Sequence, residues 1–395
     1  MSERSLKSVE ELDLLRGLAI VLMIVNHSGY RFADLQAASS DPLAAVVFLG
    51  SFAPVIFFFT TGFGVALARS GPLEWSSFAS VLGKAALLLL ADQFMFWREG
   101  STGILDFLGF IALSTVLVTA VSASKRSHTW SISLIIAILC LRFAVGPLAR
   151  HHLDGNSIVL AWLLGATSVP GVSYPLSPWM VYPLLGFLAG RSYVAHAALR
   201  NQGSKRLAAC LAASSLLPFA GAFVIHRAGS GFFRWGTMNG PFFILSLGVL
   251  LLTLAACLLI AIYWPAAMRV LGLRGISSLA VVPIHYAFID LLASAVSAPL
   301  GPIEYLLAAA VLVVACIAAS KLFAATLNRW TAGAVLVYPM VFVVIFCMAA
   351  LWWSARVTPY TAALCVVAQL AITAVLGVRN QRRMLARSAA GPSTA

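Results

Sequence analysis

Charged side chains are scarce in this sequence. Only 10% of its 395 residues are Asp, Glu, Lys or Arg, whereas 61% are hydrophobic. Ordinary soluble domains hold about 25% charged and about 45–50% apolar residues. A soluble fold cannot bury such an excess of apolar side chains, and the polar gaps between the apolar runs leave no room for a separate soluble domain. The composition therefore excludes a soluble protein and indicates one embedded in a membrane.

Acidic residues and cysteine motifs are also lacking. The chain has 13 Asp and Glu against 26 Lys and Arg, a formal net charge of +13. The basic residues are dispersed among short loops, which argues against a nucleic-acid partner, because such a partner needs a clustered basic face. The 6 cysteines fall inside apolar runs without C-x-x-C spacing. Neither a disulfide framework nor a zinc site is indicated, and we expect no metal.

Long apolar runs are what the sequence has in abundance. Runs of about twenty residues, enough to cross a hydrocarbon core of about 30 Å, recur along the chain. They predict an all-α, polytopic integral membrane helix bundle of about 10–12 transmembrane helices, forming a single domain over residues 1–378. Residues 379–395 are expected to be a disordered, basic cytoplasmic tail that touches anionic lipid. The predicted spans are 12–30, 43–68, 78–97, 103–122, 130–148, 176–195, 205–225, 240–263, 276–298, 303–323, 333–353 and 358–378.

The distribution of Lys and Arg predicts the orientation of the chain. With the N-terminus inside, most of the 26 basic residues flank inner helix ends. The positive-inside rule then places both termini in the cytoplasm, and the expected location is a bacterial inner (plasma) membrane. The first apolar run lacks an A-x-A-like cleavage site, so we expect it to be retained as a helix. The basic residues left outside are Arg31, Arg98, Arg142, Arg150, Arg227, Arg234 and Arg356.

Residues 157–178 interrupt the pattern of spans. A short apolar run, 158–166, is followed by a stretch rich in proline and glycine, so the segment is too short and too broken to cross the bilayer. Non-helical backbone at membrane depth is tolerated only where protein buries it or where it lines a wet cavity. We therefore expect a re-entrant or interfacial segment and a candidate wall for a site.

The first predicted helix, LDLLRGLAIVLMIVNHSGY, carries an unusual polar stripe. Arg16 and His27 are eleven residues apart, which returns them to nearly the same face of a helix about 16 Å apart. Asp13 lies on the same stripe and could simply pair with Arg16 at the cytoplasmic boundary, and His27 could simply sit in the outer interface. Asn26 adds a neutral donor and acceptor, and an imidazole, with a pKa of about 6.5, can act as a general base at neutral pH.

Two further predicted helices contain polar groups that the membrane should exclude. His285 follows Pro283, and it is either a second site imidazole or a side chain satisfied by a carbonyl that the proline leaves open. Asp92 lies in the apolar run LLLLADQFMFW, where it either pairs with a basic residue of another helix or supplies an acid to the site.

In FAPVIFFFTTGFGVALARS, Gly62 and Gly64 permit close helix packing or a local break.

Together these motifs resemble the transmembrane acyltransferase superfamily, comprising the acyltransferase 3 family and relatives of heparan-α-glucosaminide N-acetyltransferase. LDLLRGLAIVLMIVNH matches its first-helix pattern of R-G-x-A followed by His or Asn about eleven positions after the arginine. FFFTTGF is similar to its F-F-x-x-[ST]-G-F segment. ISSLAVVPIHY and WMVYPLLGFLAGR resemble later segments, and the matched pieces cover less than a third of the chain.

The resemblance implies transfer of an acyl group, acetyl by expectation, from cytoplasmic acyl-CoA to a hydroxyl or amine of an extracytoplasmic glycan or lipid-linked sugar. It implies that His27 is the base or a transient acyl carrier, and that Arg16 binds the CoA phosphates or orients the thioester. Asn26, His285 and Asp92 complete the expected catalytic set.

The donor side departs from the family pattern. Many acyltransferase 3 members have closely spaced arginines after the second helix, whereas this chain has only Arg69 and Lys84 there. We expect these two to assist CoA binding, with Lys125 and Arg126 as possible substitutes. The main alternative function is a transporter or flippase for a polar or lipid-linked small molecule, which would also need buried Arg, His and Asp. The absence of an internal repeat disfavours that alternative.

Overall fold

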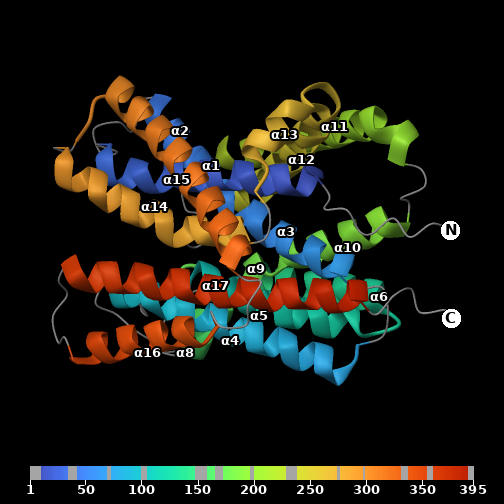
Figure 1. Cartoon of the computed structure of the whole chain (residues 1–395). Helices are drawn as coiled ribbons and strands as arrows, with labels where there is room; N and C mark the ends of the chain where they lie inside the picture. The colour runs from blue at the N-terminus through green and yellow to red at the C-terminus, as the bar shows by residue number, and fades with distance from the viewer. Residues whose placement is uncertain are drawn as a thin grey trace. The chain divides into compact units, whose positions relative to one another are not determined.

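The computed structural model is helical throughout the part of the chain that it describes (Figure 1). Its only other regular pairing there is an isolated parallel bridge between Leu105 and Val172. The prediction of an all-α membrane helix bundle is confirmed. The described residues are 10–33, 42–68, 73–98, 105–146, 158–164, 172–195, 200–227, 238–273, 276–296, 299–330, 337–353 and 359–389.

The helices fall into two compact units, each described by itself. The first unit contains residues 1–27, 35–85 and 104–272, and the second contains residues 28–34, 86–103 and 273–395. Helices α1 (Glu10–Phe32) and α4 (Trp75–Arg98) contribute residues to both. The first unit also holds α2 (Pro42–Leu49), the 3₁₀ turn η1 (Gly50–Phe52), α3 (Ala53–Ala68), α5 (Phe107–Ser122), α6 (Ser127–Cys140), the π turn η2 (Leu141–Val145), α8 (Ile158–Leu164), α9 (Leu176–Trp179), α10 (Val181–Ala195), α11 (Arg200–Arg227), α12 (Gly240–Tyr263) and α13 (Pro265–Leu271). The second holds α14 (Ile276–Ala295), α15 (Pro302–Trp330), α16 (Val337–Trp353) and α17 (Pro359–Ala389).

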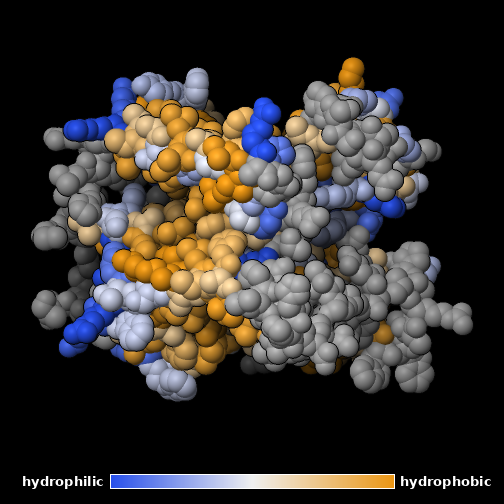
Figure 2. Space-filling model, turned by 180° about the vertical axis from the view of Figure 1, so that it is seen from behind, coloured by the Kyte–Doolittle hydropathy of each residue, from blue (hydrophilic) through white to orange (hydrophobic). Residues whose placement is uncertain are grey.

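Within the described ranges, 9 helical segments are long and apolar enough to cross a membrane, and two shorter apolar helices, Phe107–Ser122 and Pro339–Leu351, accompany them. Large hydrophobic side chains such as Leu217 and Val314 are exposed, and hydrophobic residues cover much of the surface seen in Figure 2. A surface of this kind is stable in lipid rather than in water. The chain is an integral membrane protein.

Local sequence signals explain where several helices begin. At α12 the side chain of Asn239 accepts a hydrogen bond from the Phe242 backbone N–H at 3.1 Å, and a proline occupies the first turn. This is the usual combination of an N-cap amide with an early proline. At α15 the carboxylate of Glu304 accepts from the Gly301 N–H at 3.0 Å, which caps a helix that starts at Pro302.

Glycines set the closest helix contact, between α3 and α10. A Cβ added to Gly62 would lie 1.7 Å from the Pro183 carbonyl oxygen, and one added to Gly186 would lie 1.9 Å from the Phe59 carbonyl oxygen. The two backbones therefore touch at positions where no other residue fits. The glycines predicted to permit close packing do so at Gly62.

The second part of the broken segment 157–178 packs against other residues of the first unit. Ser173 donates its backbone N–H to the Leu105 carbonyl at 3.3 Å. Tyr174 and Trp179 pack edge-on against Phe58 of α3 at centroid distances of 5.2 and 5.7 Å. Trp179 has no exposed surface. Residues 172–179 thus pack against protein, and their role as a re-entrant or interfacial segment and as a wall of a site stays a prediction.

Three local features differ from the sequence-based expectation. The span predicted over 43–68 is interrupted by η1, and the end of the span over 130–148 is a π turn. The helix α17 continues to Ala389, into the tail that was expected to be disordered. Lysine, arginine and alanine favour helix, so a basic composition alone does not end one. The division into a domain 1–378 and a tail 379–395 stays a prediction.

Candidate active site

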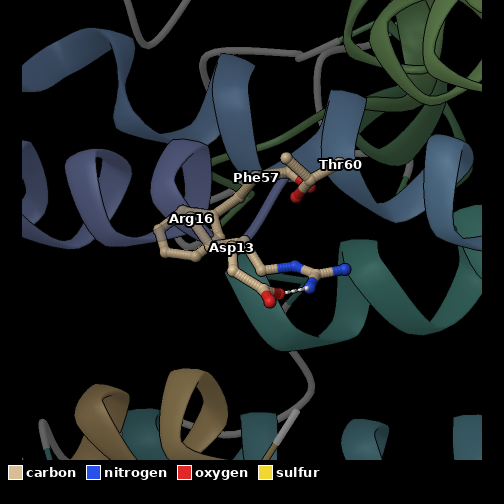
Figure 3. Close-up of polar contacts among 4 residues, drawn as sticks. All are labelled: Asp13, Arg16, Phe57 and Thr60. Atoms are coloured by element: carbon tan, nitrogen blue, oxygen red, sulfur yellow. Dashed lines mark hydrogen bonds and ion pairs between the residues drawn. The ribbon is translucent and has the colours of Figure 1, made fainter. Parts of the chain in front are cut away.

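The first helix presents Arg16 as part of a buried ion pair. Arg16 Nη1 donates to Asp13 Oδ1 at 3.0 Å, one turn earlier on α1 (Figure 3). The side chain of Asp13 is 5% exposed and that of Arg16 is 22% exposed. Ile20 and Met23, which continue the stripe toward His27, are buried. The polar stripe predicted from the sequence thus faces protein over most of its length, and the predicted partnership of Asp13 with Arg16 is confirmed.

One face of α3 lies beside this ion pair. Positions 57, 60, 61 and 64 follow helical spacing, and a Cβ added to Gly64 would lie 3.7 Å from Arg16 Nη2. The hydroxyls of Thr60 and Thr61 both donate to the Phe57 carbonyl oxygen at 2.9 Å, the Thr60 bond being drawn in Figure 3. Their protons are therefore committed to the backbone, and only their oxygen lone pairs face neighbouring groups.

Gly17, the residue after Arg16, lets the end of α13 approach the backbone of α1 directly. A Cβ added to Gly17 would lie 1.8 Å from the Leu271 carbonyl oxygen, at the end of α13. The helix end thus rests directly on the backbone of α1, one residue from the guanidinium-bearing position. This contact explains the glycine of the R-G-x-A pattern by packing, with no role in chemistry required.

Asn26 is used to join helices. Its side-chain Nδ2 donates to the Val47 carbonyl of α2 at 3.0 Å and to Ser51 Oγ at 3.4 Å. Asn26 is 7% exposed, and a Cβ added to Gly50 would lie 2.4 Å from the Asn26 Cβ. A buried amide that is bound to a carbonyl of another element mainly supports packing. His27, the next residue, is half-buried on the same turn of α1.

His285 and Asp92 belong to the second unit. His285 has no exposed surface, and its Nδ1 lies 3.0 Å from the Val281 carbonyl oxygen. A carbonyl oxygen only accepts, so Nδ1 is the donor of this bond. Asp92 is also fully buried, and the neighbouring Ala91 carbonyl accepts from Gln369 Nε2 of α17 at 2.9 Å.

The remaining candidates for cofactor binding are placed in part. Lys84 is half-buried on α4, in the first unit. Arg69 lies outside the described residues. Among the residues that are described, no group of three or more His, Cys, Asp and Glu side chains is placed to hold a metal ion.

The positive-inside rule uses Arg142 only as a marker of the outer side, but the structure buries this residue. Arg142 is 3% exposed in the π turn η2, and its guanidinium donates to the Leu164 and Met238 carbonyls. It thereby ties together the ends of three segments of the first unit. Its position deep within a predicted apolar span, at residue 142 of the run 130–148, was the signal that could have identified it.

Comparison with known families decides the class of the protein. Residues 9–225 match the family model described as heparan-alpha-glucosaminide N-acetyltransferase, catalytic. The chain belongs to this family. No curated protein and no solved structure matches it significantly.

Membership in this N-acetyltransferase family makes the chain a membrane acetyltransferase and implies acetyl-CoA as its acetyl donor. The prediction of an acyltransferase is confirmed, and the transporter alternative is set aside. The matched residues include Asp13, Arg16, His27 and the α3 face beside them. His285 lies beyond the matched range.

Proposed function

We propose that this acetyltransferase moves an acetyl group from cytoplasmic acetyl-CoA to a hydroxyl or amine of an extracytoplasmic glycan or lipid-linked sugar. The observation that supports the proposal is the placement of Arg16 and His27 on one stripe of the single helix α1, about 16 Å apart at 1.5 Å per residue. A long donor that enters from one side and an acceptor on the other side require such a separation.

His27 is the proposed general base. In the transfer step its imidazole takes the proton of the acceptor hydroxyl or amine as the acceptor oxygen or nitrogen attacks the thioester carbonyl. The carbon–sulfur bond then breaks, and the CoA sulfur leaves as the thiol with the proton returned from the imidazolium. A transient acetyl-histidine is the covalent variant of the same step, in which His27 attacks first and the acceptor second.

Arg16 is the proposed anchor for the donor. A guanidinium offers several N–H donors in a fixed plane and suits phosphate oxygens. Arg69 and Lys84 are proposed to add positive charge on the cytoplasmic side, where CoA carries its phosphates. His285 and Asp92 are proposed as a supporting imidazole and acid, and their complete burial agrees with an intramembrane role.

The experiment that tests the proposal compares two histidine variants of the purified protein. His27→Ala is expected to lower kcat about 100-fold or more, the usual contribution of a general base, with unchanged membrane abundance. His128→Ala is the matched control, because His128 is exposed at the start of α6, and it is expected to keep full activity. Labelled acetyl-CoA and a cell-envelope fraction supply the two substrates.

Two results would count against the proposal in different ways. Full activity of His27→Ala would remove His27 from the reaction while leaving the acetyltransferase intact. Failure of the wild-type protein to transfer label to any envelope fraction would instead remove the proposed acceptor class.

A further inference from the structure

In the ion pair on α1, the Arg16 guanidinium contacts Asp13 with one terminal nitrogen, and its other terminal nitrogen lies nearest to α3. Asp13 Oδ1 contacts Nη1 at 3.0 Å, whereas Nη2 is the atom nearest to the Gly64 position, at 3.7 Å from a Cβ built there. Because a guanidinium is planar and rigid, fixing Nη1 also fixes the direction of Nη2. Asp13 thus determines which N–H groups point toward α3.

The two glycines of the TTGFG segment serve different purposes. Gly62 meets the backbone of α10, where a Cβ would clash with Pro183 at 1.7 Å. A Cβ built at Gly64 would have no backbone atom of another segment within 4 Å among the described residues. The atom that it would approach is Arg16 Nη2, at 3.7 Å. Packing of α3 against α10 therefore accounts for the first glycine and does not account for the second.

The threonine hydroxyls on this part of α3 are already engaged as donors. Thr60 and Thr61 each give their hydroxyl proton to the Phe57 carbonyl. Arg16 Nη2 is therefore the donor on which the proposal rests, and its direction decides how well an anionic oxygen is bound.

We propose that Asp13 is a positioning residue for the donor site, and that the missing side chain at Gly64 provides the space in which Arg16 Nη2 binds one phosphate group of acetyl-CoA. This inference rests on the proposed donor role of Arg16. Asp13 acts through Arg16 by holding the guanidinium plane in one orientation. The absence of a side chain at Gly64 allows a group as large as a phosphate to approach Arg16 Nη2.

The first test separates orientation from charge by steady-state kinetics with acetyl-CoA as the varied substrate. Asp13→Ala removes the acceptor for Nη1 and is expected to raise KM for acetyl-CoA about 10-fold with kcat within about 3-fold of wild type. Asp13→Asn keeps an oxygen that can accept from Nη1 and is expected to hold KM within about 3-fold. An unchanged KM in Asp13→Ala, or equal effects of the two substitutions, would overturn the positioning role.

The second test fills the proposed space without touching the ion pair. Gly64→Ala already places a methyl group 3.7 Å from Nη2 and is expected to raise KM for acetyl-CoA, and Gly64→Val directs further methyl groups toward Nη2 and is expected to raise KM more, about 10-fold. Gly221→Val is the matched control on α11, because a Cβ there lies 3.6 Å from Ile244 Cγ2 and no donor residue is involved. A normal KM in Gly64→Val, or an equal rise in Gly221→Val, would contradict the proposed space.

Arg16→Ala distinguishes failure of this inference from failure of the proposed function. If Arg16→Ala raises KM and the Asp13 and Gly64 variants do not, the anchor stands and only the positioning inference falls. If Arg16→Ala leaves KM unchanged, the donor role of Arg16 falls and the inference falls with it.

Discussion

Arg16 and Asn26, two polar residues of α1, have different surroundings, and these surroundings indicate different roles. Arg16 meets a carboxylate on its own helix and the face of α3 at Gly64. Asn26 is enclosed by α2 and η1 and gives its amide protons to Val47 and Ser51. The first arrangement is the one proposed to bind a ligand, whereas the second joins parts of the protein to one another. Arg16 is only partly buried, at 22% exposed, whereas Asn26 is buried, at 7% exposed.

Asn26 is therefore expected to affect stability more than chemistry. Asn26→Ala leaves the Val47 carbonyl without its donor in a buried environment and should lower the free energy of unfolding by about 1–3 kcal/mol. We expect a lower Tm in detergent while kcat per folded molecule stays near wild type. A fall in kcat of the size expected for His27→Ala, at an unchanged Tm, would instead place Asn26 among the catalytic residues.

The sequence predicted some of these residues and not others. Asp13 and Arg16 are three apart, so their contact follows from helix geometry alone. The partner of Asn26 lies 21 residues away, and that of Gln369 lies 278 residues away, at Ala91. Contacts of such separation depend on how helices pack, which one sequence does not determine.

The contact between α3 and α10 shows how elements position the site. Phe59 and Gly62 on α3 meet Gly186 and Pro183 on α10 by direct backbone approach. The opposite side of the same α3 turns carries Gly64, where a built Cβ would lie 3.7 Å from Arg16 Nη2. A shift of α3 away from α10 would therefore also change the space beside the guanidinium.

Gly62→Ala is the substitution that tests this contact. Its Cβ would lie 1.7 Å from the Pro183 oxygen, which is backbone and cannot rotate away, so we expect a loss of about 3 kcal/mol, at the upper end of overpacking effects. Gly64→Ala is the control and should change stability by less than about 1 kcal/mol. Thermal unfolding in detergent measures both, and equal Tm values would show that α3 and α10 are less tightly joined.

The length of the apolar runs predicted where helices begin and end better than it predicted the breaks within and between them. The span predicted over 240–263 coincides with α12, and 276–298 differs from α14 only at its end. The π turn at Leu141–Val145 and the short helix α13 were not predicted. An apolar run defines where a segment can cross a membrane, whereas local changes in hydrogen bonding depend on tertiary partners such as those of Arg142.

Across the whole chain, the family match and the first compact unit end at different residues. The match ends at residue 225, inside α11, whereas the first unit continues to Gly272. Phe242 of α12 stacks on Phe52 at a centroid distance of 5.2 Å, and Leu271 contacts Gly17. The matched catalytic region is therefore completed by α12 and α13, which lie beyond it in the sequence.

The orientation of the chain connects the ion pair on α1 with its substrate. From the positive-inside rule we expect the N-terminal end of α1, and with it Arg16, to lie near the cytoplasm, the side from which acetyl-CoA is proposed to enter. We expect protease-cleavable tags at both termini to be cut in inside-out vesicles and protected in intact cells, and a tag inserted in the segment 147–157 to show the reverse pattern. The same vesicles offer a control, because acetyl-CoA added outside should support transfer only when they are inside-out. If the termini were instead cut in intact cells, Arg16 would lie on the side away from acetyl-CoA, and the donor role proposed for it would be wrong even if the family activity were present.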